Sequence, residues 1–168
     1  FILSHFYNNI RKFKKMTNKK ILIINGPNLN LLGIRESHIY GKDNLETLEI
    51  RLKKYTKEKK ISLVFFQSNS EGEIIDKIHE SLNKCTAIII NAGGYSHTSI
   101  AIRDSLKAFQ GLIYEVHISN IYSREKFRRY SYLSDISSVV ICGLGFLGYE
   151  IAIDLASDNL EQEKEIYV

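Results

Sequence analysis

Short apolar runs alternate with amphipathic segments along most of the chain, and this alternation limits the fold more than any other feature. Ile21–Ile24 is apolar throughout, which is typical of a strand buried on both faces of a parallel sheet. Four similar runs are predicted to be strands, at residues 61–66, 87–90, 112–116 and 139–141. Apolar residues at helical spacing predict helices at residues 44–59, 71–82, 99–109 and 149–156.

The order of these elements predicts an α/β fold, because strands that alternate with helices form parallel sheets with helices on their faces. With 168 residues the chain is too short for an eight-stranded barrel, which needs more than about 200. We therefore expect a doubly wound five-stranded parallel sheet in three layers, αβα. Ligands of such sheets bind beyond the carboxyl ends of the strands.

The formal net charge of +4 is unevenly distributed along the chain. Residues 1–20 contain six basic and no acidic side chains, whereas residues 21–168 contain 17 basic and 19 acidic ones. The near-neutral charge of residues 21–168 argues against nucleic acid as a partner. No apolar run in the sequence is long enough to span a membrane. We expect residues 1–20 to be a basic, poorly ordered extension, with a transit peptide or a membrane-surface helix as the alternatives. Residues 21–168 are expected to form a single domain.

The two cysteines, Cys85 and Cys142, both lie in apolar runs. This pattern favours reduced, buried thiols and a cytoplasmic location over a disulfide framework. His97 and His117 lack partners at the spacing of metal ligands, so we expect no metal site.

Polar clusters follow the first, third and fourth predicted strands, at residues 25–33, 91–99 and 115–120. They contain amides, hydroxyls, imidazoles and glycines, which bind the oxygen atoms of ligands. Because the carboxyl ends of parallel strands meet at one edge of the sheet, we expect a site for a small molecule there. Two charged segments adjoin the clusters: residues 34–41, bracketed by glycines like a lid, and residues 124–129.

Six sequence segments resemble the type II 3-dehydroquinate dehydratases, in order from about Ile21 to Ala156. They are NGPNLNLLG, RESHIYG, FFQSNSEG, NAGGYSHTSIAIRD, EVHISN and REKFRRYSY. The resemblance implies a flavodoxin-like fold and a lyase that dehydrates 3-dehydroquinate to 3-dehydroshikimate through an enolate, without a Schiff base or any cofactor. Such a reaction belongs to the shikimate pathway of aromatic amino acid biosynthesis or to quinate breakdown. The chain departs from the family pattern at Ser37, Tyr122 and Tyr130, which affects loop stiffness and rim contacts.

The resemblance assigns the removal of a carbon-bound proton to Tyr40. Tyrosine has a pKa of about 10, so a base that works near neutral pH needs its phenolate favoured by about 4 kcal/mol. Arg35 lies five residues earlier on the same segment and is the expected source of this stabilisation, to which Arg124 can add.

His117 resembles the family's acid, which protonates the departing hydroxide. Glu115 lies two residues before it, on the same face of the predicted strand, and is placed to orient the ring. Asn28 resembles the residue that stabilises the enolate through a bound water, and a turn-forming role is its alternative. The backbone N–H groups of Ile118 and Ser119, with the Ser119 hydroxyl, resemble the family's cradle for the substrate carboxylate.

Asn91, His97 and Arg128 resemble the groups that hold the substrate hydroxyls. Asp104 resembles a residue that reaches the active site of a neighbouring subunit, which links catalysis to assembly. The resemblance accordingly implies a homo-oligomer in which trimers assemble into a dodecamer.

A non-catalytic flavodoxin-like binding module remains the main alternative, since the same polar strand ends can hold a phosphate or a flavin. A related lyase that acts on another hydroxylated cyclic acid is a second one. The segment 143–148, GLGFLG, matches a dinucleotide-binding fingerprint, but the 20 residues that follow are too few for the rest of that motif. A flavin-binding module would be yellow on purification, whereas only a lyase would turn over substrate.

Overall fold

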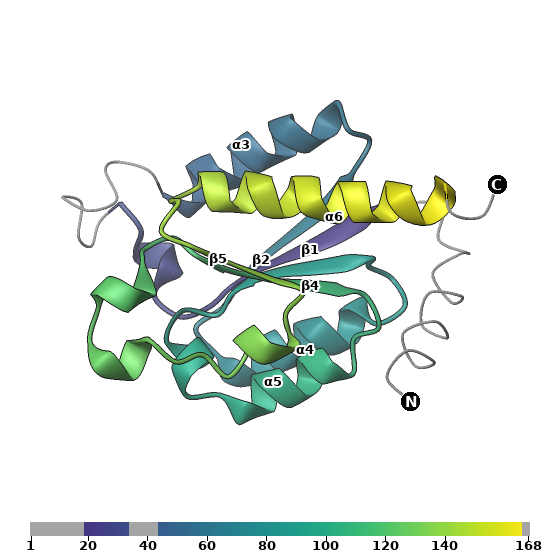
Figure 1. Ribbon diagram of the computed structural model, residues 1–168. Helices are drawn as coiled ribbons and strands as arrows, with labels where there is room; N and C mark the ends of the chain where they lie inside the picture. Colours follow the sequence, from purple (N-terminus) through teal and green to yellow (C-terminus); the bar gives the residue numbers. More distant parts are fainter. Residues whose placement is uncertain (1–18, 34–43, 166–168) are drawn as a thin grey trace.

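The computed structural model describes residues 19–33 and 44–165, with side chains up to residue 158. A five-stranded parallel sheet lies between two layers of helices (Figure 1). The strands are β1 (Lys20–Asn25), β2 (Ser62–Gln67), β3 (Ala87–Asn91), β4 (Leu112–His117) and β5 (Val139–Cys142). Their order in the sheet is β2-β1-β3-β4-β5, which confirms the predicted doubly wound, flavodoxin-like arrangement.

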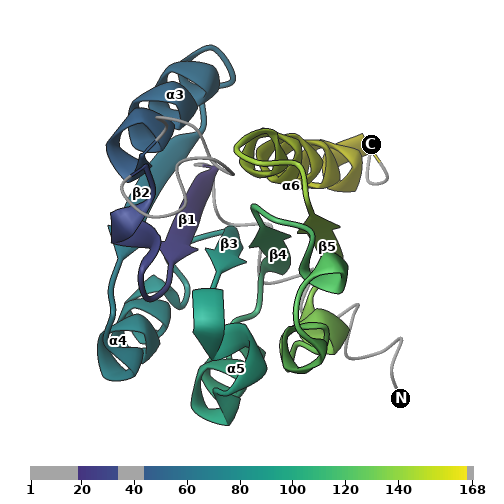
Figure 2. The same ribbon diagram turned by 90° about the vertical axis from the view of Figure 1, so that its left-hand side faces the viewer.

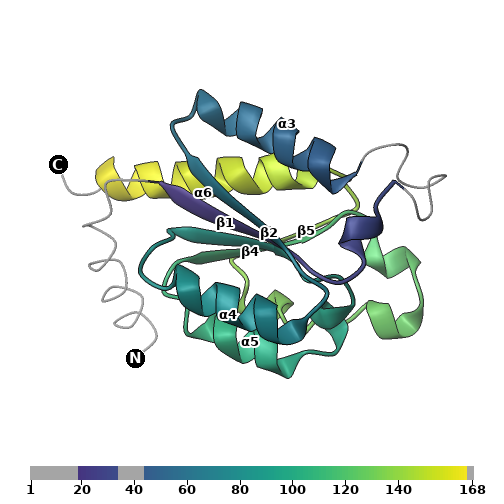
Figure 3. The same cartoon turned by 180° about the vertical axis from the view of Figure 1, so that it is seen from behind.

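Two helices cover each face of the sheet (Figures 1 and 3). One face carries α3 (Leu45–Lys57) and α6 (Leu147–Glu165), and the other carries α4 (Glu71–Ser81) and α5 (Ile100–Lys107). Side chains of β1 alternate between the two cores, with Ile21 and Ile23 under α3 and α6, and Leu22 and Ile24 under α4 and α5. Burial on both faces therefore explains the continuous apolar run of β1.

Side-chain caps fix where three helices begin. Asn44 and Thr47 form a capping box at the start of α3, in which the Asn44 side chain accepts from the Thr47 N–H at 2.8 Å. Ser70 caps α4, and Ser99 caps α5 by accepting from the Ile102 N–H at 2.9 Å. These caps satisfy backbone donors that the first turn of a helix leaves without partners.

The last helix, α6, is longer than the predicted segment 149–156. It begins two residues earlier and continues to Glu165, although the residues after Ser157 are mostly charged. The apolar pattern in the sequence ends before the helix does, so periodicity alone underestimates its length. Residues 143–146 of the glycine-rich segment form the turn from β5 into α6, and Gly148 in the first turn of α6 lies close to Ile141.

The loops that follow β1 and β3 lie against one another. The Gly26 N–H donates to the Asn91 carbonyl at 2.8 Å, and a Cβ on Gly26 would lie only 2.2 Å from the Ala92 carbonyl oxygen. Only glycine tolerates this approach. As a result, the polar segments after these two strands meet at the carboxyl edge of the sheet, which faces the viewer in Figure 2.

The predicted burial of both cysteines is only partly correct. Cys85 is buried, whereas Cys142, the last residue of β5 at the sheet edge, is half-buried, and neither forms a disulfide. Among the helices described, none is long and apolar enough to cross a bilayer.

Candidate active site

A pocket of about 260 Å³ opens at the carboxyl edge of the sheet. It lies where the strand order reverses between β1 and β3, as expected for a doubly wound sheet. Its walls come from the segments after β1, β3 and β4, including the short 3-10 turns η1 (Leu29–Leu31), η2 (Gly93–His97) and η4 (Lys126–Arg128). Seven residues selected from the sequence line it: Asn28, Asn91, His97, His117, Ile118, Ser119 and Arg128.

The other three residues selected from the sequence are not found in this pocket. Arg35 and Tyr40 lie outside the described residues. Asp104 is exposed on α5 and does not line the pocket of its own chain. Its contact with a neighbouring subunit stays a prediction.

His117 is the last residue of β4 and is only 5% exposed. Its Nε2 lies 2.8 Å from Oε1 of Glu115, two residues earlier on the same side of the strand. A carboxylate can only accept hydrogen bonds, so Nε2 carries the proton in this contact. The ring nitrogen that remains for a ligand is therefore Nδ1.

Glu115 is fully buried and accepts hydrogen bonds on both carboxylate oxygens. Ser131 Oγ donates to Oε1 and Ser134 Oγ donates to Oε2, each at 2.5 Å. Burial by itself would raise the pKa of Glu115, but the hydrogen bonds from His117 and the two serines hold it below the usual value. Glu115 is therefore charged at neutral pH.

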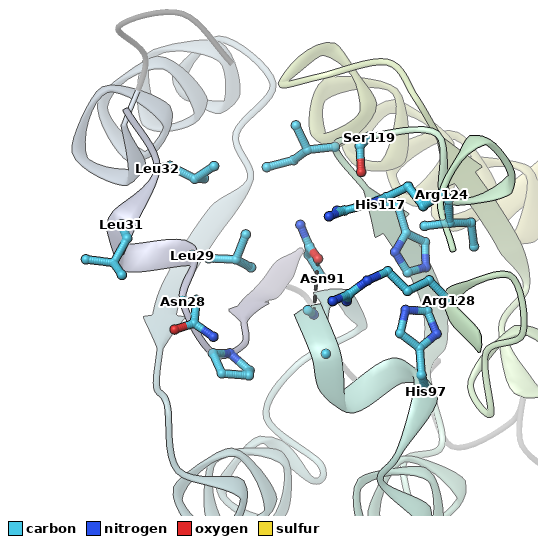
Figure 4. A pocket seen from close by; sticks show the side chains of 15 residues that line it. Asn28, Leu29, Leu31, Leu32, Asn91, His97, His117, Ser119, Arg124 and Arg128 are labelled. Atoms are coloured by element: carbon cyan, nitrogen blue, oxygen red, sulfur yellow. Dashed lines mark hydrogen bonds between the residues drawn. The ribbon is translucent and has the colours of Figure 1, made fainter. Parts of the chain in front are cut away.

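His97 is held differently from His117. Its Nδ1 donates to the Tyr130 carbonyl at 2.7 Å, which leaves Nε2 as an acceptor. Burial lowers the pKa of His97, and the nearby His117 and Arg128 lower it further, so the ring is neutral. The two imidazoles stack with their centroids 6.4 Å apart and form one wall of the pocket (Figure 4).

Asn91, at the end of β3, is oriented by a contact with Tyr149 of α6. Its Nδ2 donates to the Tyr149 hydroxyl at 3.0 Å, and its Oδ1 accepts from the Gly93 N–H at 3.3 Å. The Tyr149 hydroxyl donates in turn to Asn25 Oδ1 at 2.6 Å. Burial raises the pKa of Tyr149, so it remains a neutral phenol that can serve both contacts.

Asn28 has a left-handed backbone conformation, with φ 65°, at the start of η1. Its backbone N–H donates to Asn69 Oδ1 at 2.9 Å, whereas its side chain makes no capping hydrogen bond to the turn. Asn28 therefore takes part in the turn through its backbone, while its side chain does not cap it. The amide is exposed on the pocket wall, where it can meet a ligand or a water.

The pocket is electropositive at its rim. Arg124 and Arg128 extend into it from the side opposite Asn28 (Figure 4). Glu125 Oε2 accepts from Arg128 Nε at 3.0 Å and lies 3.8 Å from Arg124 Nε, so it restrains both side chains from outside. Among the residues described, no aspartate or glutamate lines the pocket, so the arrangement suits an anionic ligand.

Three supporting residues were not selected from the sequence: Ser131, Ser134 and Tyr149. Tyr149 has the pattern of a core aromatic on an amphipathic helix, and only its hydroxyl contacts show its second role. The serines lie 16 and 19 residues after Glu115, in an irregular segment. Ser131 lies within the segment REKFRRYSY that resembles the family, whereas Ser134 lies outside every such segment.

Comparison with known proteins gives a consistent result. Residues 19–157 match the family model described as dehydroquinase class II. The chain is 51% identical over 147 residues to the catabolic 3-dehydroquinase 2 of Aspergillus fumigatus, covering 88% of this chain and 98% of that protein. It is 48% identical over 144 residues to a 3-dehydroquinate dehydratase of Actinobacillus pleuropneumoniae, covering 86% and 94%.

A solved structure has the same fold. The crystal structure of the type II dehydroquinase from Butyrivibrio crossotus superimposes with a TM-score of 0.81 and 47% sequence identity. The match covers 84% of this chain and 99% of that one.

Proposed function

The chain belongs to the class II dehydroquinases, and from this premise we propose that it dehydrates 3-dehydroquinate to 3-dehydroshikimate. The observation that carries the proposal is the buried Glu115–His117 pair, which opens onto a pocket with two arginines at its rim. A charged carboxylate behind an imidazole is the arrangement of an acid-base catalyst, and the arginines match a substrate that carries a carboxylate.

His117 serves as the acid for the departing hydroxide. Glu115 holds Nε2, so the proton that reaches the leaving group comes from Nδ1. The negative charge of Glu115 orients the ring and balances the positive charge of its acid form.

The remaining pocket residues hold the substrate. The backbone N–H groups of Ile118 and Ser119, directly after His117, bind its carboxylate together with the Ser119 hydroxyl. His97 offers Nε2 as an acceptor for a substrate hydroxyl, and Asn91 and Arg128 bind further hydroxyls.

The enolate needs a donor where its negative charge develops. Asn28 fills this role through a bound water, because its side chain lies on the pocket wall and is not used to cap η1. The oxygen that becomes negative is then stabilised opposite the imidazole wall.

Tyr40 removes the carbon-bound proton, with Arg35 lowering its pKa. The support for this assignment is the segment RESHIYG, which resembles the family's lid. The described walls of the pocket contain no tyrosine, carboxylate or lysine, so a base of these types has to come from another part of the chain.

Asp104 completes the site of a neighbouring subunit in a homo-oligomer of trimers that form a dodecamer. Two features of α5 support this: Asp104 is exposed away from its own pocket, and Ile100 on the same helix is 57% exposed. An exposed apolar side chain beside an unused carboxylate fits a subunit contact.

The experiment that tests the function compares His117→Gln with His79→Gln. His79 is exposed in the last turn of α4, so its substitution is a matched control. We expect His117→Gln to lower kcat by about 10²- to 10⁴-fold, the usual contribution of an acid, while calorimetry shows that 3-dehydroshikimate still binds. Equal turnover in the two variants would refute the assignment, and binding without turnover in the parent would favour the non-catalytic module.

A further inference from the structure

The segment 130–135 supports both imidazoles of the pocket from behind. The Tyr130 carbonyl fixes the tautomer of His97. Ser131 and Ser134 donate to the two oxygens of Glu115, which in turn holds His117. One irregular segment thus carries the groups that fix both rings, although no part of it lines the pocket.

The directions of these hydrogen bonds follow from the other contacts of the serines. Ser131 is only 7% exposed, and its Oγ accepts from the Leu133 N–H at 3.1 Å. Its hydroxyl proton is therefore committed to Glu115. Ser134 supplies the second oxygen, so each carboxylate oxygen of this buried charge has a hydroxyl donor.

The outer end of the segment is fixed to α5. Arg103 donates to the Tyr132 carbonyl, and its NH2 group lies 2.9 Å from Asp135 Oδ2. The Tyr132 N–H donates to the Ser96 carbonyl at 2.8 Å. These contacts hold the serines in place independently of Glu115.

We propose that Ser131 and Ser134 are positioning residues for the acid step, because their hydroxyls keep Glu115 charged and in contact with Nε2 of His117. The proposal rests on the dehydratase function, since it concerns how the acid of that reaction is held. Without these donors the buried carboxylate takes up a proton at a higher pH and no longer fixes the ring in the form that presents Nδ1 to the substrate.

The titratable groups that face Glu115 come from three elements. His117 of β4 donates to it, and His97 of η2 and Cys142 of β5 lie within its field. Burial raises the pKa of Cys142 and the charge of Glu115 raises it further, so this thiol stays neutral. The two hydroxyls are thus the main support of the charge besides His117.

The test measures kcat against pH for Ser131→Ala, Ser134→Ala and the double variant. On the acid side, we expect the pH at which activity is half lost to move upward by about one unit for each hydroxyl removed, with little change in KM. Ser137→Ala is the matched control, because Ser137 Oγ donates to the Leu133 carbonyl at 2.9 Å and not to Glu115. The pH profile of Ser137→Ala should coincide with that of the parent. Ser134→Thr keeps the hydroxyl and should therefore also keep the parent profile.

Two readouts separate this proposal from the function on which it rests. A parent protein without dehydratase activity refutes the function, whereas an active parent whose acid limb coincides with that of the folded alanine variants overturns the role of the serines. Imidazole ¹⁵N resonances of the parent give a test that needs neither substrate nor a folded variant. A proton on Nε2 of His117 at neutral pH supports the proposal, and a bare Nε2 overturns it.

Discussion

Replacing Glu115 with glutamine tests how much of the acid step depends on the buried charge. The amide has nearly the shape of the carboxylate, so the pocket keeps its form. With its oxygen in the place of Oε1, glutamine still accepts from His117 and Ser131, while Ser134 turns to accept from the NH2 group. The perturbation is therefore mainly the loss of charge.

The expected magnitude follows from the strength of that contact. Hydrogen bonds to a charged acceptor contribute about 1.5–3 kcal/mol, against about 0.5–1.5 kcal/mol for neutral pairs. The His117 contact is thus weakened by about 1–2 kcal/mol, which corresponds to a fall in kcat of roughly 5- to 30-fold. KM should change by less than about threefold, because Glu115 does not line the pocket.

The assay is the initial rate of 3-dehydroshikimate formation at saturating substrate, with Glu49→Gln as the control, because Glu49 is a partly exposed residue of α3 that does not line the pocket. A folded Glu115→Gln variant whose kcat lies within twofold of the parent would show that the charge is not needed. A loss as large as that of His117→Gln would show that Glu115 does more than orient and balance the ring.

Four further outcomes are expected. The pKa of Glu115 is lower in the folded protein than in the unfolded chain, where it is about 4.3, so the charged carboxylate stabilises the fold at pH values above that value. This stabilisation is lost as the pH falls through the folded pKa. Denaturant titrations should therefore show that acidification destabilises the parent more than Glu115→Gln. Tyr149→Phe leaves Asn91 Nδ2 and Asn25 Oδ1 without their partner, so the melting temperature should fall by about 3–10 °C in calorimetry, and by less in the control Tyr55→Phe, because Tyr55 is only partly buried. Tyr40→Phe should lower kcat by about 10²-fold or more while product affinity, measured by calorimetry, is kept; turnover within a few-fold of the parent would remove Tyr40 as the base. Asp104→Ala should lower kcat without changing the fold, and light scattering that shows a monomeric, fully active parent would contradict the shared site.

The sequence predicted best those strands and helices whose pattern of apolar residues lies within the element itself. β1 and β3 are mostly continuous apolar runs because both faces of each strand are buried. Such runs are easily recognised in the sequence as strands. The end of α6 was missed because the residues after Ser157 are mostly charged, so no apolar periodicity in the sequence marks the last turns.

The pocket was predictable in outline, and so was the support of His117 by Glu115, but the other supporting contacts were not. Asn28, Asn91, His97 and His117 stand at the ends of strands or in the turns that follow them, so the topology alone brings them together. The tautomers of the two histidines depend on Tyr130, Ser131 and Ser134, which approach only through tertiary folding of an irregular segment. Such contacts have no periodicity from which they can be predicted.

The most direct measurement is the ultraviolet absorbance of chelator-treated, purified protein mixed with 3-dehydroquinate. Dehydration creates a conjugated enone, which absorbs where the substrate does not. The account predicts a steady rise that is unaffected by pretreatment with borohydride and substrate, because no imine forms. No rise from a folded and assembled protein, or a rise that borohydride abolishes, would contradict it.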